Sequence, residues 1–192
     1  MATSAMAEMK KLFEFIRVVG RLKSLKRTGW VNAGVKDPET VSGHMYRMAM
    51  LSFIIDEKRD HVSRDQCIKL ALVHDLAESI VGDITPFEGI TVEEKHRREK
   101  EAMENIAKLV SNTVGNELLD LWNEYEKQLT KEAQFVKDLD KFDMIMQAFE
   151  YEEAENKPGR LQDFFNSVEG KFKTETVKTW VDYLKEERIR NN

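Results

Sequence analysis

The stretch of residues 68–81 is apolar on nearly every side of a helix, yet it carries the adjacent pair His74 and Asp75, and Glu78 one turn later. A helix that is apolar all round is normally buried inside a protein. Burying a charged side chain without a partner costs free energy, so such side chains pair with one another or bind a metal ion. The stretch therefore predicts a buried helix that carries polar groups into a shared site.

Two other apolar stretches carry residues of the same kind, His44 in residues 41–51 and Asp140 in residues 135–142. Together with His74 and Asp75 they form a His…His-Asp…Asp pattern. Imidazole and carboxylate ligands suit Mn, Fe, Co, Ni or Zn, with Mg possible, and the lack of cysteine ligands argues against a structural zinc site. On a continuous helix Glu78 falls angularly between His74 and Asp75, so all three can face one cavity.

Each of these residues also has a simpler interpretation. A single His44 is more often a satisfied core histidine than a metal ligand, and Asp140 can pair with Lys137 or Lys141 on a helix surface. The joint occurrence of the four residues, with His74 and Asp75 inside an apolar run, favours a metal site that joins three helices.

Asp83 follows Gly82 directly after this predicted helix. An aspartate in that place is commonly a turn residue. The alternative is a carboxylate that points into the same cavity as Glu78. Two such carboxylates can hold a second metal ion or act as a general base.

Size and composition limit the class of protein. A chain of 192 residues, 34% charged and 41% hydrophobic, fits one globular domain over residues 1–192, with a core from about 8 to 188 and the C-terminal helices packed on it. A net charge of −5 gives no sign of a nucleic-acid partner, and no stretch reaches the about 18 apolar residues of a membrane span. Cys67 is the single cysteine, which fits a buried small side chain and a reducing compartment. With no recognisable secretory signal, the sequence predicts a cytoplasmic protein.

Helical periodicity dominates the chain, which has only three prolines and nine glycines, and no alternating strand pattern competes with it. We therefore expect an all-α helical bundle. Capping signals at Asp37, Ser63 and Thr91 mark three helix starts. The helices are expected near residues 8–25, 38–56, 64–81, 92–110, 114–127, 130–155, 161–168 and 174–188.

The pattern of His44, His74, Asp75 and Asp140 resembles the metal-dependent phosphohydrolases of the HD-domain family. Longer strings resemble one branch of it, the HD domain-containing protein 2 branch, over about residues 12–187. These strings are RTGW at 27–30, ETVSGHMYRMA at 39–49, LVHDLAE at 72–78, VGDI at 81–84, EEKHRRE at 93–99 and KPGRLQDF at 157–164.

The resemblance implies an all-α HD-domain fold and a 5′-deoxynucleotidase, which hydrolyses deoxynucleoside 5′-monophosphates to deoxynucleoside and phosphate. It implies a divalent cofactor (Mn, Co or Mg, with two ions possible) and a homodimer. His44, His74, Asp75 and Asp140 would bind the first ion. Glu78, Asp83 and the carbonyl of Ile84 would bind a second. The residues implied at the substrate are Trp30 at the sugar, where it helps to exclude a 2′-hydroxyl, and Asp83, Ile84, Thr85 and Pro86 along its length.

One departure from the bacterial relatives concerns the phosphate. They place an arginine directly before the tryptophan, where this chain has Gly29. Arg27 is the first substitute, and Arg47 and the basic cluster at residues 95–98 are others. By spacing alone, that cluster reads as a solvated face paired with glutamates.

The expected mechanism has metal-bound Asp75 close to the phosphate, and Glu78 or Asp83 placing the attacking water. Other members of the family share the ligand set, so a cyclic-nucleotide phosphodiesterase, a deoxynucleoside triphosphohydrolase and a diiron oxygenase are alternatives. A non-catalytic helical module stabilised by its metal is another.

Overall fold

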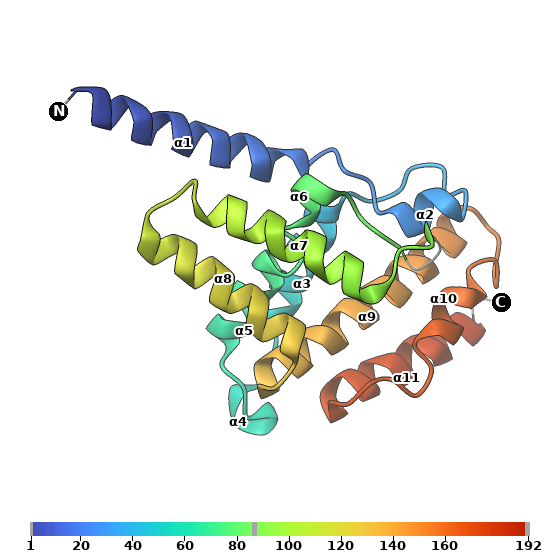
Figure 1. Ribbon diagram of the computed structural model, residues 1–192. Coiled ribbons are helices and arrows are strands. Elements are labelled where there is room, and N and C mark those ends of the chain that lie inside the picture. Colours follow the sequence, from blue (N-terminus) through green and yellow to red (C-terminus); the bar gives the residue numbers. More distant parts are fainter. Residues whose placement is uncertain (1, 86–87, 191–192) are drawn as a thin grey trace. The chain divides into compact units, whose positions relative to one another are not determined.

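The computed structural model describes residues 2–85 and 88–190, and within them the regular secondary structure is helical, apart from an isolated bridge between Lys26 and Thr40. The prediction of an all-α protein is confirmed (Figure 1). The helices are α1 (Ala2–Arg21), α2 (Thr28–Asn32), α3 (Val41–Phe53), α4 (Glu57–Asp60), α5 (Arg64–Val73), α6 (Glu78–Val81), α7 (Val92–Ala107), α8 (Asn112–Lys127), α9 (Lys131–Ala154), α10 (Gln162–Ser167) and α11 (Glu175–Arg190). Within the described residues, no helix combines the length and the apolarity needed to cross a membrane.

The chain divides into two compact units. Unit 1 comprises residues 1–46 and 72–123, and unit 2 comprises residues 47–71 and 124–192. Helix α3 begins in unit 1, and α5 ends there. The expectation of one domain over the whole chain stays a prediction.

In unit 1, the short helix α6 contacts both α1 and α7. Helix α7 begins at the predicted place, because the Thr91 hydroxyl accepts the backbone N–H of Glu94 at 3.2 Å. Ala102, Met103 and Ile106 are buried along one face of α7, at the spacing of an amphipathic helix. Helix α7 is thus fixed against the segment that carries Glu78.

In unit 2, the long helix α9 contacts α10 and α11. Its fully buried Asp138 accepts hydrogen bonds from the backbone N–H groups of Lys173 and Thr174, both at 2.7 Å, just before α11 begins. Cys67 is buried in this unit, and burial together with nearby glutamates raises the pKa of its thiol to about 12. The expectation that Cys67 is a buried small side chain is confirmed.

The predicted continuous helix over residues 64–81 is wrong in one respect. Helix α5 ends at Val73, and a tight turn over residues 74–77 precedes α6. In this turn the N–H of Leu76 bonds to the carbonyl of Val73 at 3.0 Å, and that of Glu78 to Asp75 at 3.1 Å. These bonds connect residues three apart, which is the tighter 3₁₀ pattern. The angular argument from a continuous helix therefore does not apply to His74, Asp75 and Glu78.

The helix predicted from Pro38 begins later, at Val41. The Lys26 ammonium donates to the carbonyl of Pro38 at 2.6 Å and pairs with Asp37, and Lys26 also forms a bridge with Thr40, so the segment before Val41 lies beside residue 26. The Thr40 hydroxyl then accepts the N–H of Gly43 at 3.1 Å and supplies the cap. Helices α2 and α4 lie in segments where the sequence predicted no helix.

Candidate metal centre

The structure brings together His44 from α3 with His74 and Asp75 from the turn between α5 and α6. Each offers a ligand atom, and the three atoms all lie within 4.8 Å of one another. The Nε2 atoms of His74 and His44 lie 3.2 and 3.8 Å from Oδ2 of Asp75. Both histidines are buried. Two imidazoles and a carboxylate that converge at this range are a donor set that fits a divalent metal ion.

Asp75 is held as a carboxylate by its neighbours. Burial by itself would raise its pKa, but His74, His44 and the Arg27 guanidinium outweigh burial and hold the pKa below its ordinary value. Arg27 Nη1 lies 3.4 Å from Oδ2 of Asp75. The Arg27 guanidinium therefore lies next to this group of ligand atoms and compensates part of the Asp75 charge.

Glu78 opens α6 beside this group and is only 4% exposed. Its Oε2 has no hydrogen-bond partner in the part of the chain that the structure describes. Burial, and then the charges of Asp75 and Asp83, raise the pKa of Glu78 well above its ordinary value. A buried carboxylate oxygen without a hydrogen bond is unfavourable, and a bound cation would stabilise it.

The segment after Gly82 is tied to the rest of unit 1 at each residue from 83 to 85. Asp83 Oδ2 accepts the backbone N–H of Thr28 at 2.6 Å. The carbonyl of Ile84 accepts from the Lys95 ammonium at 3.0 Å. Thr85 donates through its N–H and its hydroxyl to Glu88. Pro86, the last predicted substrate residue, lies outside the described residues.

Trp30 lies on α2 and is only 1% exposed. Its indole Nε1 donates to Oε1 of Glu39 at 3.0 Å, which fixes the ring. No feature of the sequence singles out Glu39 among the 35 acidic residues. Its role depends on a contact between α2 and the segment before α3, and no local spacing encodes that contact.

Of the basic residues weighed for the phosphate, Arg47 is already engaged. Its guanidinium donates to Asp143 and, at 2.7 Å, to Glu150, all within unit 2. Two acidic partners satisfy the single positive charge, so Arg47 is a weaker candidate than Arg27.

The basic cluster on α7 divides into two kinds of residue. Arg97 and Arg98 both pair with Glu94 on the exposed side, as the spacing predicted. Lys95 instead turns inward to the carbonyl of Ile84. Burial by itself lowers the pKa of Lys95, but the surrounding carboxylates, Glu99 first, raise it above its ordinary value. Lys95 could not be separated from its neighbours by spacing, because the burial of its i,i+4 partner Glu99 is visible only in the structure.

Asp140 belongs to unit 2. Its carboxylate accepts hydrogen bonds from the Tyr125 hydroxyl at 2.7 Å and from Lys137 at 2.9 Å, and the Lys137 contact is the local pairing that the spacing allowed. Its place in the metal centre stays a prediction.

Comparison with known proteins identifies the class. The model of the HD-domain family matches residues 19–180, and the chain belongs to this family. It is 51% identical over 187 residues to "5′-deoxynucleotidase HDDC2" of Xenopus laevis, covering 97% of this chain and 92% of that protein. It is 52% identical over 182 residues to the protein of the same name in Homo sapiens, covering 95% and 88%. Among solved structures, PH0347 of Pyrococcus horikoshii OT3 matches with a TM-score of 0.74 and 33% identity, over 94% of this chain and 99% of that one.

Proposed function

We propose that this protein is a 5′-deoxynucleotidase that uses a divalent metal ion to hydrolyse deoxynucleoside 5′-monophosphates. The observation that carries the proposal is that relatives bearing this name share about half of all residues over nearly the full chain. The group of His44, His74 and Asp75, in which both histidines are buried and beside which Glu78 lies, supports the proposal because its donor set fits a divalent ion.

His44, His74, Asp75 and Asp140 would hold the first ion, and Glu78, Asp83 and the carbonyl of Ile84 a second. Mn²⁺, Co²⁺ and Mg²⁺ are the ions to test. A divalent ion bound there supplies Lewis acidity at the phosphoryl oxygens and lowers the pKa of a coordinated water.

Glu78 or Asp83 would position the attacking water and accept its proton. Arg27 would pair with the phosphate oxygens that the ion leaves uncompensated. The ring of Trp30, fixed by Glu39, would form the wall beside the sugar. A ribose hydroxyl left without a partner against that wall would be penalised.

A panel of nucleotides tests the function. Phosphate release is measured from dAMP, AMP and dATP, with EDTA-treated protein and added Mn²⁺, Co²⁺ or Mg²⁺. The proposal expects metal-dependent release from dAMP and much slower release from AMP. Conversion of dATP alone to deoxyadenosine and triphosphate, followed by chromatography because it releases no inorganic phosphate, would point to a triphosphohydrolase. No turnover with metal bound would point to another chemistry of this family or to a non-catalytic module.

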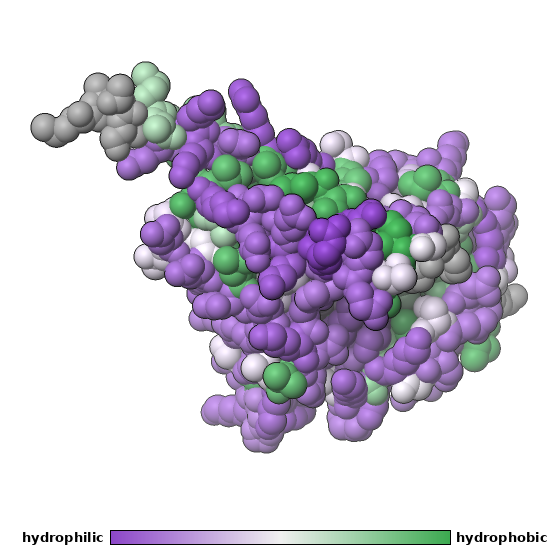
Figure 2. Space-filling model, viewed as in Figure 1, coloured by the Kyte–Doolittle hydropathy of each residue, from purple (hydrophilic) through white to green (hydrophobic). Residues whose placement is uncertain are grey.

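We propose further that the protein forms a homodimer through α1. Met6, Met9, Phe13 and Ile16 recur at the spacing of a coiled-coil seam and are 51–74% exposed, while Val18 and Leu22 are buried on the opposite side of the helix. Apolar side chains gather beside α1 in Figure 2. In an antiparallel pair of α1 helices, Met6 would meet Ile16 and Met9 would meet Phe13, so the seam is complementary to itself.

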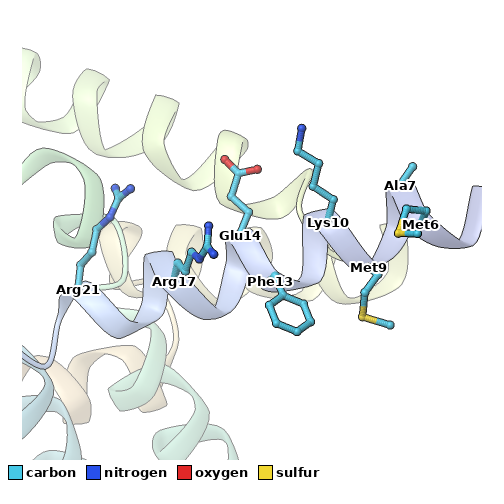
Figure 3. Close-up of a pocket in the computed structure, with 8 residues that line it drawn as sticks. All are labelled: Met6, Ala7, Met9, Lys10, Phe13, Glu14, Arg17 and Arg21. Atoms are coloured by element: carbon cyan, nitrogen blue, oxygen red, sulfur yellow. The ribbon is translucent and has the colours of Figure 1, made fainter.

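An open hollow of about 940 Å³ runs along this helix (Figure 3). It is lined by Met6, Ala7, Met9, Lys10, Phe13, Glu14, Arg17 and Arg21. Light scattering on the double variant Met9→Glu, Phe13→Glu tests the seam. The wild type is expected at the mass of two chains and the variant at the mass of one, and a variant that stays dimeric rules out this seam.

The cytoplasmic location remains a prediction from the sequence.

A further inference from the structure

Lys95 links α7 to the turn that carries Asp83 and Ile84. Its Nζ donates to the carbonyl of Ile84 at 3.0 Å and lies 3.6 Å from Oε1 of Glu99 one turn further along α7. Glu99 is itself buried. The ammonium is therefore held from both sides, and its position is defined by the fold.

The same carbonyl is an oxygen that a second metal ion would use in the proposed function. A divalent ion binds a carbonyl oxygen at about 2.0–2.6 Å. An ion at that range and an ammonium 3.0 Å from the same oxygen would be close neighbours with charges of the same sign. In a partly buried site, repulsion between such charges is only weakly screened.

The nearby carboxylates also indicate that Lys95 weakens binding of a cation. Asp75, Glu78 and Asp83 all act on Lys95 electrostatically, so the ammonium already compensates part of the negative charge that would attract an ion. Removing that charge while leaving the carboxylates in place would leave a stronger cation site.

We propose that Lys95 is a positioning residue that holds the Asp83–Ile84 turn, and that its ammonium competes with a second divalent ion for the Ile84 carbonyl. The ion is thereby kept weakly bound and exchangeable. The proposal rests on the proposed function only for the location of the second ion, and its test needs no nucleotide.

Calorimetric titration of the EDTA-treated full chain with Mn²⁺ tests this competition. The variants are Lys95→Met, which removes the charge, Lys95→Arg, which keeps it, and Lys100→Met, which removes an exposed lysine from the same helix. We expect Lys95→Met to bind its weaker ion about tenfold or more tightly than the wild type does, or to gain an ion that the wild type does not bind. Lys95→Arg and Lys100→Met should match the wild type.

A second neutral variant of Lys95 controls for a folding defect. Lys95→Gln keeps an N–H donor for the Ile84 carbonyl but carries no charge, and it should reproduce the tighter binding. The proposal is overturned if both neutral variants bind the weaker ion no more tightly than the wild type, if no variant binds a second ion, or if Lys100→Met shows the same gain. Failure of dAMP hydrolysis with this titration intact would contradict the proposed function alone.

Discussion

Asp75 is the residue on which the charges of the site converge, because both histidines and Arg27 act on its carboxylate. His44, His74 and Asp75 could be identified from the sequence because they are polar residues inside apolar stretches. The same reasoning did not find Glu39 or the inward turn of Lys95. Burial of a polar group leaves a mark in the local pattern, whereas a hydrogen bond between segments distant in the chain leaves none.

Replacing Asp75 with Asn tests its role as a ligand. The amide keeps the size of the side chain but loses the negative charge, so metal affinity and dAMP hydrolysis should both fall. The loss of affinity should exceed the about 10- to 100-fold that removal of an outer-shell partner costs. Asp65→Asn on the exposed side of α5 is the matched control and should change neither. Metal content equal to the wild type in Asp75→Asn would remove Asp75 from the ligand set.

Arg27→Met tests the assignment of the phosphate contact. Loss of a charge-assisted hydrogen bond should raise the KM for dAMP about tenfold or more, and Arg27→Lys should recover part of it. Steady-state kinetics measure the effect, and Lys23→Met at a nearby exposed lysine is the control. A KM unchanged by Arg27→Met would mean that another cation contacts the phosphate, with Lys95 as the next candidate.

At the level of elements, most helices could be predicted because their apolar periodicity and caps are local properties. Helix α7 begins at its predicted cap, and α8 to α11 fall close to their predicted ranges. The break after Val73 could not be predicted, because the residues that follow it favour a helix by composition. The tight turn there places His74 and Asp75 beside His44, so a tertiary requirement overrides the local preference.

Asp138 should matter to the docking of α11 rather than to chemistry. Its buried carboxylate accepts hydrogen bonds from two backbone N–H groups before α11 and forms an ion pair with Lys141. Asp138→Ala would leave these donors and the ammonium without their acceptor, and we expect it to lower the free energy of unfolding by about 3 kcal/mol. Urea unfolding measures this, with Asp163→Ala on the exposed side of α10 as control. Equal stability of the two variants would contradict the anchoring role.

For the whole molecule, the helical class follows from the periodicity and the few prolines and glycines, and the family membership agrees with it. The site could be predicted only as a set of residues, because the sequence does not encode the distances between them. Its geometry depends on how α2, α6 and α7 meet within unit 1, which local spacing does not determine.

Metal should stabilise the folded chain, since an ion that binds only the folded state adds its binding free energy to folding. At an ion concentration about 100 times the Kd, the gain is about 2.7 kcal/mol. Differential scanning calorimetry of EDTA-treated protein with and without Mn²⁺ should show a higher Tm with the ion. The increase should be smaller in Asp75→Asn than in Asp65→Asn, and a Tm that Mn²⁺ leaves unchanged in the wild type would contradict a folded-state metal site.

The most direct test of the central claim is the initial rate of phosphate release from dAMP as Mn²⁺ is titrated into EDTA-treated protein. The account predicts no release without the ion, a rate that rises and saturates with Mn²⁺, and no comparable rise in Asp75→Asn. Release by the metal-free wild type, or an equal rise in Asp75→Asn, would contradict a metal-dependent deoxynucleotidase centred on His44, His74 and Asp75.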